Sequence, residues 1–145
     1  MVEVTRSFTV AASPEAVVDY LRDFSRAVEW DPGTVSCERI GGGEVAVGAR
    51  WHNVSKIAGV KTELTYELKR LEPGRVVFVG ENDTATSTDD ISVVAGDEAG
   101  TSKLTYHATI EFHGVAKLAA PVAKAVFEKV GNDTEKRLTR VLEAR

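Results

Sequence analysis

The sequence lacks the residues and runs that several protein classes need. Cys37 is the only cysteine in 145 residues, so the chain can form neither an internal disulfide nor a cysteine cluster for a metal. No stretch approaches the ~18 consecutive apolar residues of a membrane-spanning helix. Residues 1–6 alternate in polarity and show no apolar core of a signal peptide. We therefore expect a cytoplasmic protein without an integral membrane segment.

An excess of basic residues and the common catalytic motifs are also missing. The net charge is −4, which does not favour a nucleic-acid partner. There is no His-Glu-x-x-His motif, no nucleotide-binding glycine pattern and no Gly-x-Ser-x-Gly elbow. His107 and Glu111 share a strand face but would lie ~13 Å apart, too far to bind one ion. We expect no metal and no cofactor.

What the sequence does contain is typical of one globular domain spanning residues 1–145. Hydrophobic residues make up 43% and charged residues 28% of the chain, and no repeat or linker divides it. The oligomeric state stays open.

The first thirty residues predict one strand followed by two short helices. Apolar residues of one parity predict the strand over 2–10. Ser13-Pro14-Glu15-Ala16 predicts a helix start, because serine caps a helix and proline suits its first turn. The helical pattern breaks near Asp23 and resumes to about Glu29. Asp31-Pro32-Gly33 ends it.

The remaining chain predicts a β-meander and a long helix. Period-two polarity predicts strands at 34–40, 47–56, 60–71, 75–81, 86–94 and 102–112. Turn-forming residues such as Gly41-Gly42-Gly43 and Ala58-Gly59 separate them, and such short connections require antiparallel neighbours. The final thirty residues carry a helical apolar stripe: Leu118, Val122, Val126, Val130, Leu138, Val141 and Leu142. Pro121 should start or kink this helix, and Gly131-Asn132 is a second place where it could bend or break.

This order of elements predicts an α+β fold with internal space. A seven-stranded twisted antiparallel sheet must bury its apolar face, and the C-terminal helix is the one long element available to cover it. A helix ~10–12 Å wide cannot fill the concavity of such a sheet. Large side chains, the short helices or a ligand must occupy the rest.

Several segments together resemble the START-like (SRPBCC) superfamily, and more narrowly its bacterial polyketide cyclase/dehydrase and lipid-transport group. They are Ser13–Val17, the Trp30-Asp31-Pro32-Gly33 turn, the glycine-rich 41–48 hairpin and the closing helix. The resemblance spans essentially the whole chain. It implies the helix-grip fold, in which the sheet wraps around the C-terminal helix and two short helices lie between strands 1 and 2. The matching positions are turns and core positions, so the resemblance does not fix an activity.

Strand parity predicts which side chains face the cavity. Tyr66 and Tyr106 bring hydroxyls inward, where they could orient a ligand oxygen or serve as core aromatics. Asn53 would bond either a ligand or its neighbours. The other predicted ligand-binding residues are apolar: Trp30, Trp51, Phe78, Phe112, Val122, Val126 and Phe127.

Asp89 is the candidate for chemistry, together with Tyr106. Asp89 shares parity with Ile91 and Val93 and therefore faces inward, opposite to Asp90. An inward carboxylate with a raised pKa could act as a general base. Alternatively, the hydroxyls of residues 84–88 simply satisfy it.

Three functions remain open at this point. The first is binding or transport of a small hydrophobic molecule, such as a lipid, polyketide or related metabolite, in the cavity. The second is a polyketide cyclase or dehydratase using the same cavity, although Arg6 is the one arginine that shares parity with an apolar strand face. The third is a protein-interaction module, which would need an exposed docking patch.

Overall fold

The computed structural model describes residues 1–57 and 59–145, so Ala58 of the expected Ala58-Gly59 turn lies outside the described residues. A strand and three short helical segments come first: β1 (Val2–Val10), α1 (Pro14–Leu21), η1 (Phe24–Arg26) and α2 (Ala27–Trp30). The meander follows: β2 (Thr34–Ile40), β3 (Arg50–Ile57), β4 (Val60–Glu72), β5 (Arg75–Glu81), β6 (Ala85–Ala95) and β7 (Ser102–Phe112). The chain closes with η2 (Gly114–Ala119) and α3 (Ala120–Glu143).

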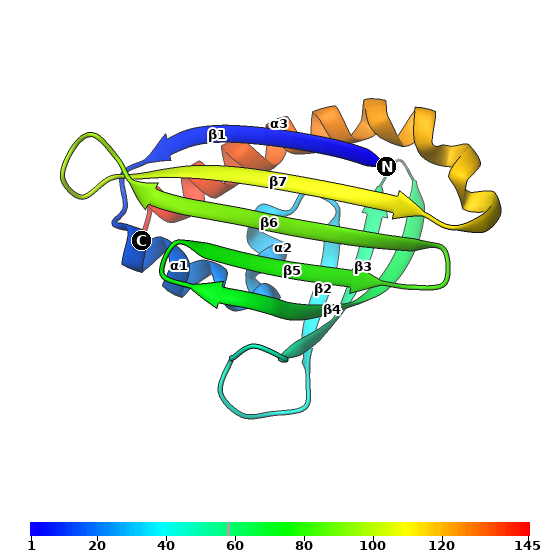
Figure 1. Ribbon diagram of the computed structural model, residues 1–145, viewed down its shortest axis with the longest axis horizontal. Helices are drawn as coiled ribbons and strands as arrows, with labels where there is room; N and C mark the ends of the chain where they lie inside the picture. The colour runs from blue at the N-terminus through cyan, green and yellow to red at the C-terminus, as the bar shows by residue number, and fades with distance from the viewer. Residues whose placement is uncertain (58) are drawn as a thin grey trace.

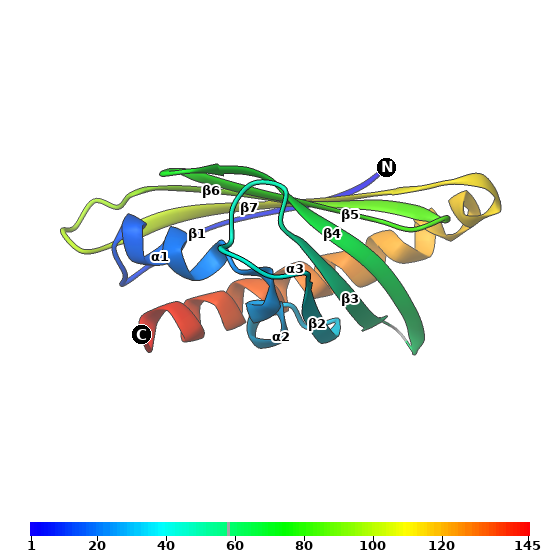
Figure 2. The same ribbon diagram turned by 90° about the horizontal axis from the view of Figure 1, so that it is seen from below.

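All seven strands form one antiparallel sheet in the order β1-β7-β6-β5-β4-β3-β2 (Figure 1). The sheet is strongly curved, and α1, α2 and α3 all lie on its concave side (Figure 2). The predicted helix-grip architecture is confirmed. Helix α3 lies beside β1, and the β2–β4 half of the sheet curls toward the helix from the other side.

Local capping explains how the short helices enter and leave this concave face. The Ser13 hydroxyl accepts a hydrogen bond from the Ala16 amide at 3.3 Å, and Pro14 occupies the first turn of α1. At the end of α2, Asp31 Oδ1 accepts from the Gly33 amide at 3.1 Å and Oδ2 accepts from the Thr34 hydroxyl at 2.9 Å. These bonds fix the turn that leads into β2.

Aromatic side chains fill the space between the short helices and the sheet. Phe24 contacts Phe78 with ring centroids 4.4 Å apart and Tyr66 at 4.5 Å. Trp30 and Trp51 approach Phe24 edge-on at 6.0 and 6.2 Å. Offset and edge-to-face contacts of this kind add to the hydrophobic stabilisation of a core. This end of the concavity is therefore solid.

Helix α3 is seated on β1 at a glycine. Gly131 is buried, and a Cβ at this position would stand 2.6 Å from Val4 Cγ2. Beside it, Arg6 donates to the Glu128 carbonyl oxygen and to Asn132 Oδ1, each at 3.0 Å. The helix runs unbroken through the Gly131-Asn132 step, where the sequence allowed a bend or break. The glycine serves close packing, and Pro121 lies in the first turn of α3 as expected of a helix start.

We expect Gly131→Ala to destabilise the protein although alanine is the better helix former. Overpacking costs about 1–3 kcal/mol, against a gain of about 1 kcal/mol in helix propensity. Chemical denaturation of Gly131→Ala, Val4→Ala and the double variant measures this, because Val4→Ala removes the obstructing methyl group. Additive effects of the two substitutions would contradict the proposed contact.

Two sequence expectations about apolar faces are wrong. Leu118 and Val122, expected on the inward stripe of the helix, are 84% and 69% exposed, and the buried residues of α3 begin only at Gly131. The buried residues of α3 lie from its middle onward, whereas the preceding turns face the open space between the helix and the end of β3. Val47, expected at the start of an inward strand face, is 60% exposed. It lies in the loop before β3, where Gly48 adopts a φ of +98°.

Candidate functional site

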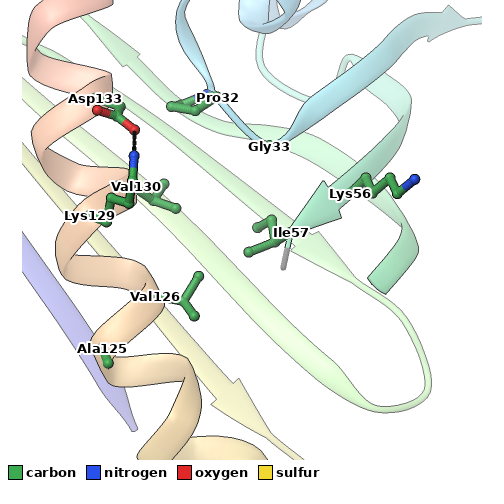
Figure 3. A pocket seen from close by; sticks show the side chains of 9 residues that line it. All are labelled: Pro32, Gly33, Lys56, Ile57, Ala125, Val126, Lys129, Val130 and Asp133. Carbon is green, nitrogen blue, oxygen red and sulfur yellow. Dashed lines mark hydrogen bonds and ion pairs between the residues drawn. The ribbon is translucent and has the colours of Figure 1, made fainter. Parts of the chain in front are cut away.

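An open groove lies between α3 and β3, where the helix does not reach the curled half of the sheet. Its volume is about 450 Å³. Figure 3 shows its walls, which come from the α2–β2 turn, from the end of β3 and from one face of α3: Pro32, Gly33, Lys56, Ile57, Ala125, Val126, Lys129, Val130 and Asp133. Val126, Val130 and Ile57 face each other across it. Lys129 and Asp133 bond each other at 2.8 Å along the helix. The groove is therefore apolar, with charged side chains at its margins on both the α3 side and the β3 side.

A smaller, more enclosed cavity of about 110 Å³ adjoins the groove beneath the sheet. Ile57 and Val130 line both spaces, so the cavity lies directly beside the groove, on its inner side. Its other apolar lining residues are Val4, Leu64, Ala108, Ile110 and Phe127. Its polar lining residues are Asp31, Ser55, Thr62, Tyr66, Ser87, Asp89 and Tyr106. The volume is several times the roughly 10–15 Å³ that one water needs.

Asp89 and Tyr106 form the most buried polar pair of this cavity. They come from neighbouring strands, β6 and β7, and the Tyr106 hydroxyl donates to Asp89 Oδ1 at 2.6 Å. Burial, reinforced by the nearby charge of Asp31, raises the pKa of Asp89 to about 7. Burial also raises the pKa of Tyr106 well above its ordinary value, and the charge of Asp89 adds to this. Tyr106 is thus a fixed donor, while Asp89 can exchange a proton near neutral pH.

Tyr66 supplies the second hydroxyl, and a glycine determines where its ring lies. The Tyr66 hydroxyl donates to Ser87 Oγ at 3.2 Å, and burial raises the pKa of Tyr66 well above its ordinary value. Gly80 lies opposite Tyr66 on β5, and a Cβ there would stand 2.6 Å from the ring. The ring of Tyr66 therefore lies over Gly80, and the Tyr66 hydroxyl lies along the cavity wall.

The structure brings four of the residues predicted from the sequence to the inner cavity and one to the groove. Tyr66, Tyr106, Asp89 and Phe127 line the inner cavity. Val126 lines the groove. Their contact with a ligand stays a prediction.

The other predicted residues lie elsewhere. Trp30, Trp51 and Phe78 belong to the solid aromatic core and line neither space. Phe112 lies at the far end of β7, in a hollow beside Met1 and Lys117. Val122 is exposed and lines neither space, so its expected place on the cavity wall is wrong.

Asn53 is buried beneath the α2–β2 turn and its amide is used within the protein. Its Nδ2 donates to the Thr34 hydroxyl at 3.1 Å, and its Oδ1 accepts from the Ser55 hydroxyl at 2.6 Å. Of the two alternatives that the sequence left open, bonding to neighbours accounts for this geometry. Asn53 supports the turn that carries Asp31.

Sequence reasoning missed Asp31 and Ser87. The sequence pattern identifies Asp31 only as part of a helix-ending turn, and no periodicity connects that turn with the β6–β7 face across the fold. Ser87 shares strand parity with Asp89, so the same argument that placed Asp89 inward could have found it. Within residues 1–57 and 59–145, no three His, Cys, Asp or Glu side chains are grouped so that they could hold a metal ion. No helix in this part of the chain has the length and apolar character to cross a membrane.

Residues 1–143 match the model of the family described as polyketide cyclase / dehydrase and lipid transport. The chain belongs to this family. No curated protein matches the sequence.

Solved structures share the fold of this polyketide cyclase / dehydrase and lipid transport family member. A START superfamily protein from Mycobacterium smegmatis is 16% identical with a TM-score of 0.79, covering 98% of this chain and 97% of its own. The Zhui aromatase/cyclase from Streptomyces sp. R1128 is 16% identical with a TM-score of 0.81, covering 99% and 94%. TTHA0849 from Thermus thermophilus is 17% identical with a TM-score of 0.79, covering 98% and 97%. At these identities the likeness establishes the fold of the START superfamily.

Proposed function

We propose that the protein binds a small, largely apolar molecule whose polar end enters the inner cavity and whose body lies in the groove. The observation that carries this proposal is that the two spaces adjoin at Ile57 and Val130, which line both of them. The groove volume of about 450 Å³ lies within the roughly 300–1,000 Å³ of small-molecule sites. An apolar wall with a few convergent polar groups at one end is the usual composition of such sites.

Native mass spectrometry of the purified protein, followed by organic extraction, tests the proposal directly. We expect a bound apolar molecule, or binding of at least one member of a panel of apolar alcohols, ketones, amines and acids. An empty protein that binds no member of the panel would contradict the proposal.

A matched pair of substitutions on α3 tests whether the groove is the binding surface. Val126→Trp should fill the groove and weaken ligand binding about tenfold or more, because the indole occupies the space of the apolar body. Val122→Trp, one turn earlier on the same helix, points to solvent and should leave affinity unchanged. Titration calorimetry with any ligand found by extraction measures both. Equal effects of the two variants would exclude the groove as the site.

A second candidate function is proton transfer on a bound substrate, as in a cyclisation or dehydration. Asp89 favours it, because a general acid or base works best when its pKa lies near the working pH and that of Asp89 is about 7. The Zhui structure is that of an aromatase/cyclase, which makes poly-β-keto compounds the first substrates to assay. Turnover that is lost in Asp89→Asn while ligand binding persists would favour the enzyme over the carrier.

A further inference from the structure

The charges on the wall of the inner cavity have one sign. Asp31 and Asp89 are its two carboxyl groups, and the other polar groups that line it are hydroxyls. No basic side chain is among the described residues lining it. The lysines of the site, Lys56 and Lys129, line the outer groove instead. The inner end therefore disfavours an anionic group and offers a place for a cationic one.

Asp89 provides a free acceptor at this inner end. Its Oδ1 accepts from Tyr106, whereas no described residue donates a hydrogen bond to Oδ2. Only 7% of Asp89 is exposed, and it lines the cavity. A buried carboxylate with one hydrogen bond and no cation is costly, and each added donor or opposite charge stabilises it. Asp31 differs, because both of its oxygens already accept bonds from its own turn.

We infer that the polar end of the ligand is a protonated amine, which donates to Asp89 Oδ2 while the apolar body lies in the groove between α3 and β3. This inference rests on the proposed binding function and specifies its ligand class. An amine supplies both the missing donor and the missing charge. An alcohol supplies only a donor, and a carboxylate or phosphate would place like charges together within the cavity.

The titratable groups around Asp89 make the affinity for an amine depend on pH. Asp31 faces it from the α2–β2 turn, Tyr66 from β4 and Tyr106 from β7. Arg137 of α3 lowers the pKa of Asp31, whereas the pKa of Asp89 is set by burial, by the charge of Asp31 and by the hydrogen bond from Tyr106. Because the pKa of Asp89 is about 7 without ligand, an incoming cation displaces its proton. Amine affinity should therefore rise between about pH 5 and pH 8, since alkylamines remain protonated there.

The test compares octylamine, 1-octanol and octanoate, which share one hydrocarbon chain, by titration calorimetry at about pH 7.5. We expect octylamine to bind about tenfold or more tightly than octanol, and octanoate more weakly than octanol. Repeating the amine titration in buffers of different ionisation enthalpy should show proton release. Asp89→Asn should abolish both the amine preference and the proton release.

Asp90→Asn is the matched control, because Asp90 is the adjacent carboxylate, points to the other face and bonds Arg75 at 2.6 and 3.0 Å. It removes the same charge and should keep the amine preference. Octanol binding as tightly as octylamine, or a preference that survives in Asp89→Asn, would overturn the amine assignment while leaving the binding function intact. If none of the three probes binds, the proposed function fails together with the inference.

Discussion

Replacing Phe78 with alanine should lower the free energy of unfolding by about 3–5 kcal/mol, the usual cost of truncating a buried phenylalanine. Phe78 is fully buried, with its ring 4.4 Å from Phe24 and 5.7 Å from Trp51 between ring centroids. The surrounding rings belong to two layers, the sheet and the short helices, and cannot collapse into the space without moving one layer. Urea denaturation followed by circular dichroism measures the change.

Phe127→Ala is the comparison that separates core from cavity. Phe127 is half-buried and already borders an open space, so its truncation enlarges a cavity instead of creating one. We expect a smaller loss of stability than for Phe78→Ala, accompanied by weaker ligand binding. Comparable losses of stability in the two variants would show that the inner space is closed by close packing and is not a ligand cavity.

Stability should also fall as the pH rises, by about 4 kcal/mol between about pH 4 and pH 7, because of Asp89. Its pKa is about 7 in the folded protein and 3.8 when unperturbed, so the folded state holds a proton that the unfolded state releases. The stabilising contribution is complete below the unfolded pKa and is lost as the pH rises through the folded one. Asp31, whose pKa is raised mainly by burial, acts in the same direction.

Thermal denaturation at several pH values measures this dependence in the unmodified protein and in two variants. Asp89→Asn should lose most of the decline and be the more stable protein at about pH 8. Asp90→Asn keeps the buried carboxyl group of Asp89, so its stability should show the same pH dependence as that of the unmodified protein. A decline that is the same in Asp89→Asn would show that Asp89 is ionised throughout, as a well-solvated carboxylate is.

The sequence predicts the order of strands and helices well because each depends on local patterning. Period-two polarity defines the strands, and Ser13-Pro14 and Pro121 define helix starts that the structure retains. The exceptions have separate causes, since Val47 lies in the loop before β3. The apolar stripe of α3 indicates a face of the helix, but not how far the sheet extends beneath it, and Val122 lies beyond that extent.

The candidate site is less predictable, because strand parity gives a direction and not a depth. Tyr106 and Phe78 both face inward, yet one meets open space and the other meets Phe24. The difference depends on where the short helices lie, which is a tertiary property. Asp31 reaches the cavity for the same reason. Parity was sufficient only for side chains such as Asp89, whose strand crosses the cavity itself.

Helix α3 is anchored unequally along its length. Its buried residues, Gly131, Thr134, Leu138 and Leu142, all lie from the middle of the helix onward, and Arg6 bonds it at Glu128 and Asn132. The turns that precede Glu128 contribute no buried residue and are held only at their C-terminal end. Moving these turns exposes little buried apolar surface, so the free-energy cost of the movement is small. If the proposed binding function holds, we expect the groove to accept ligands whose apolar parts differ in width, while Asp89 distinguishes their polar ends.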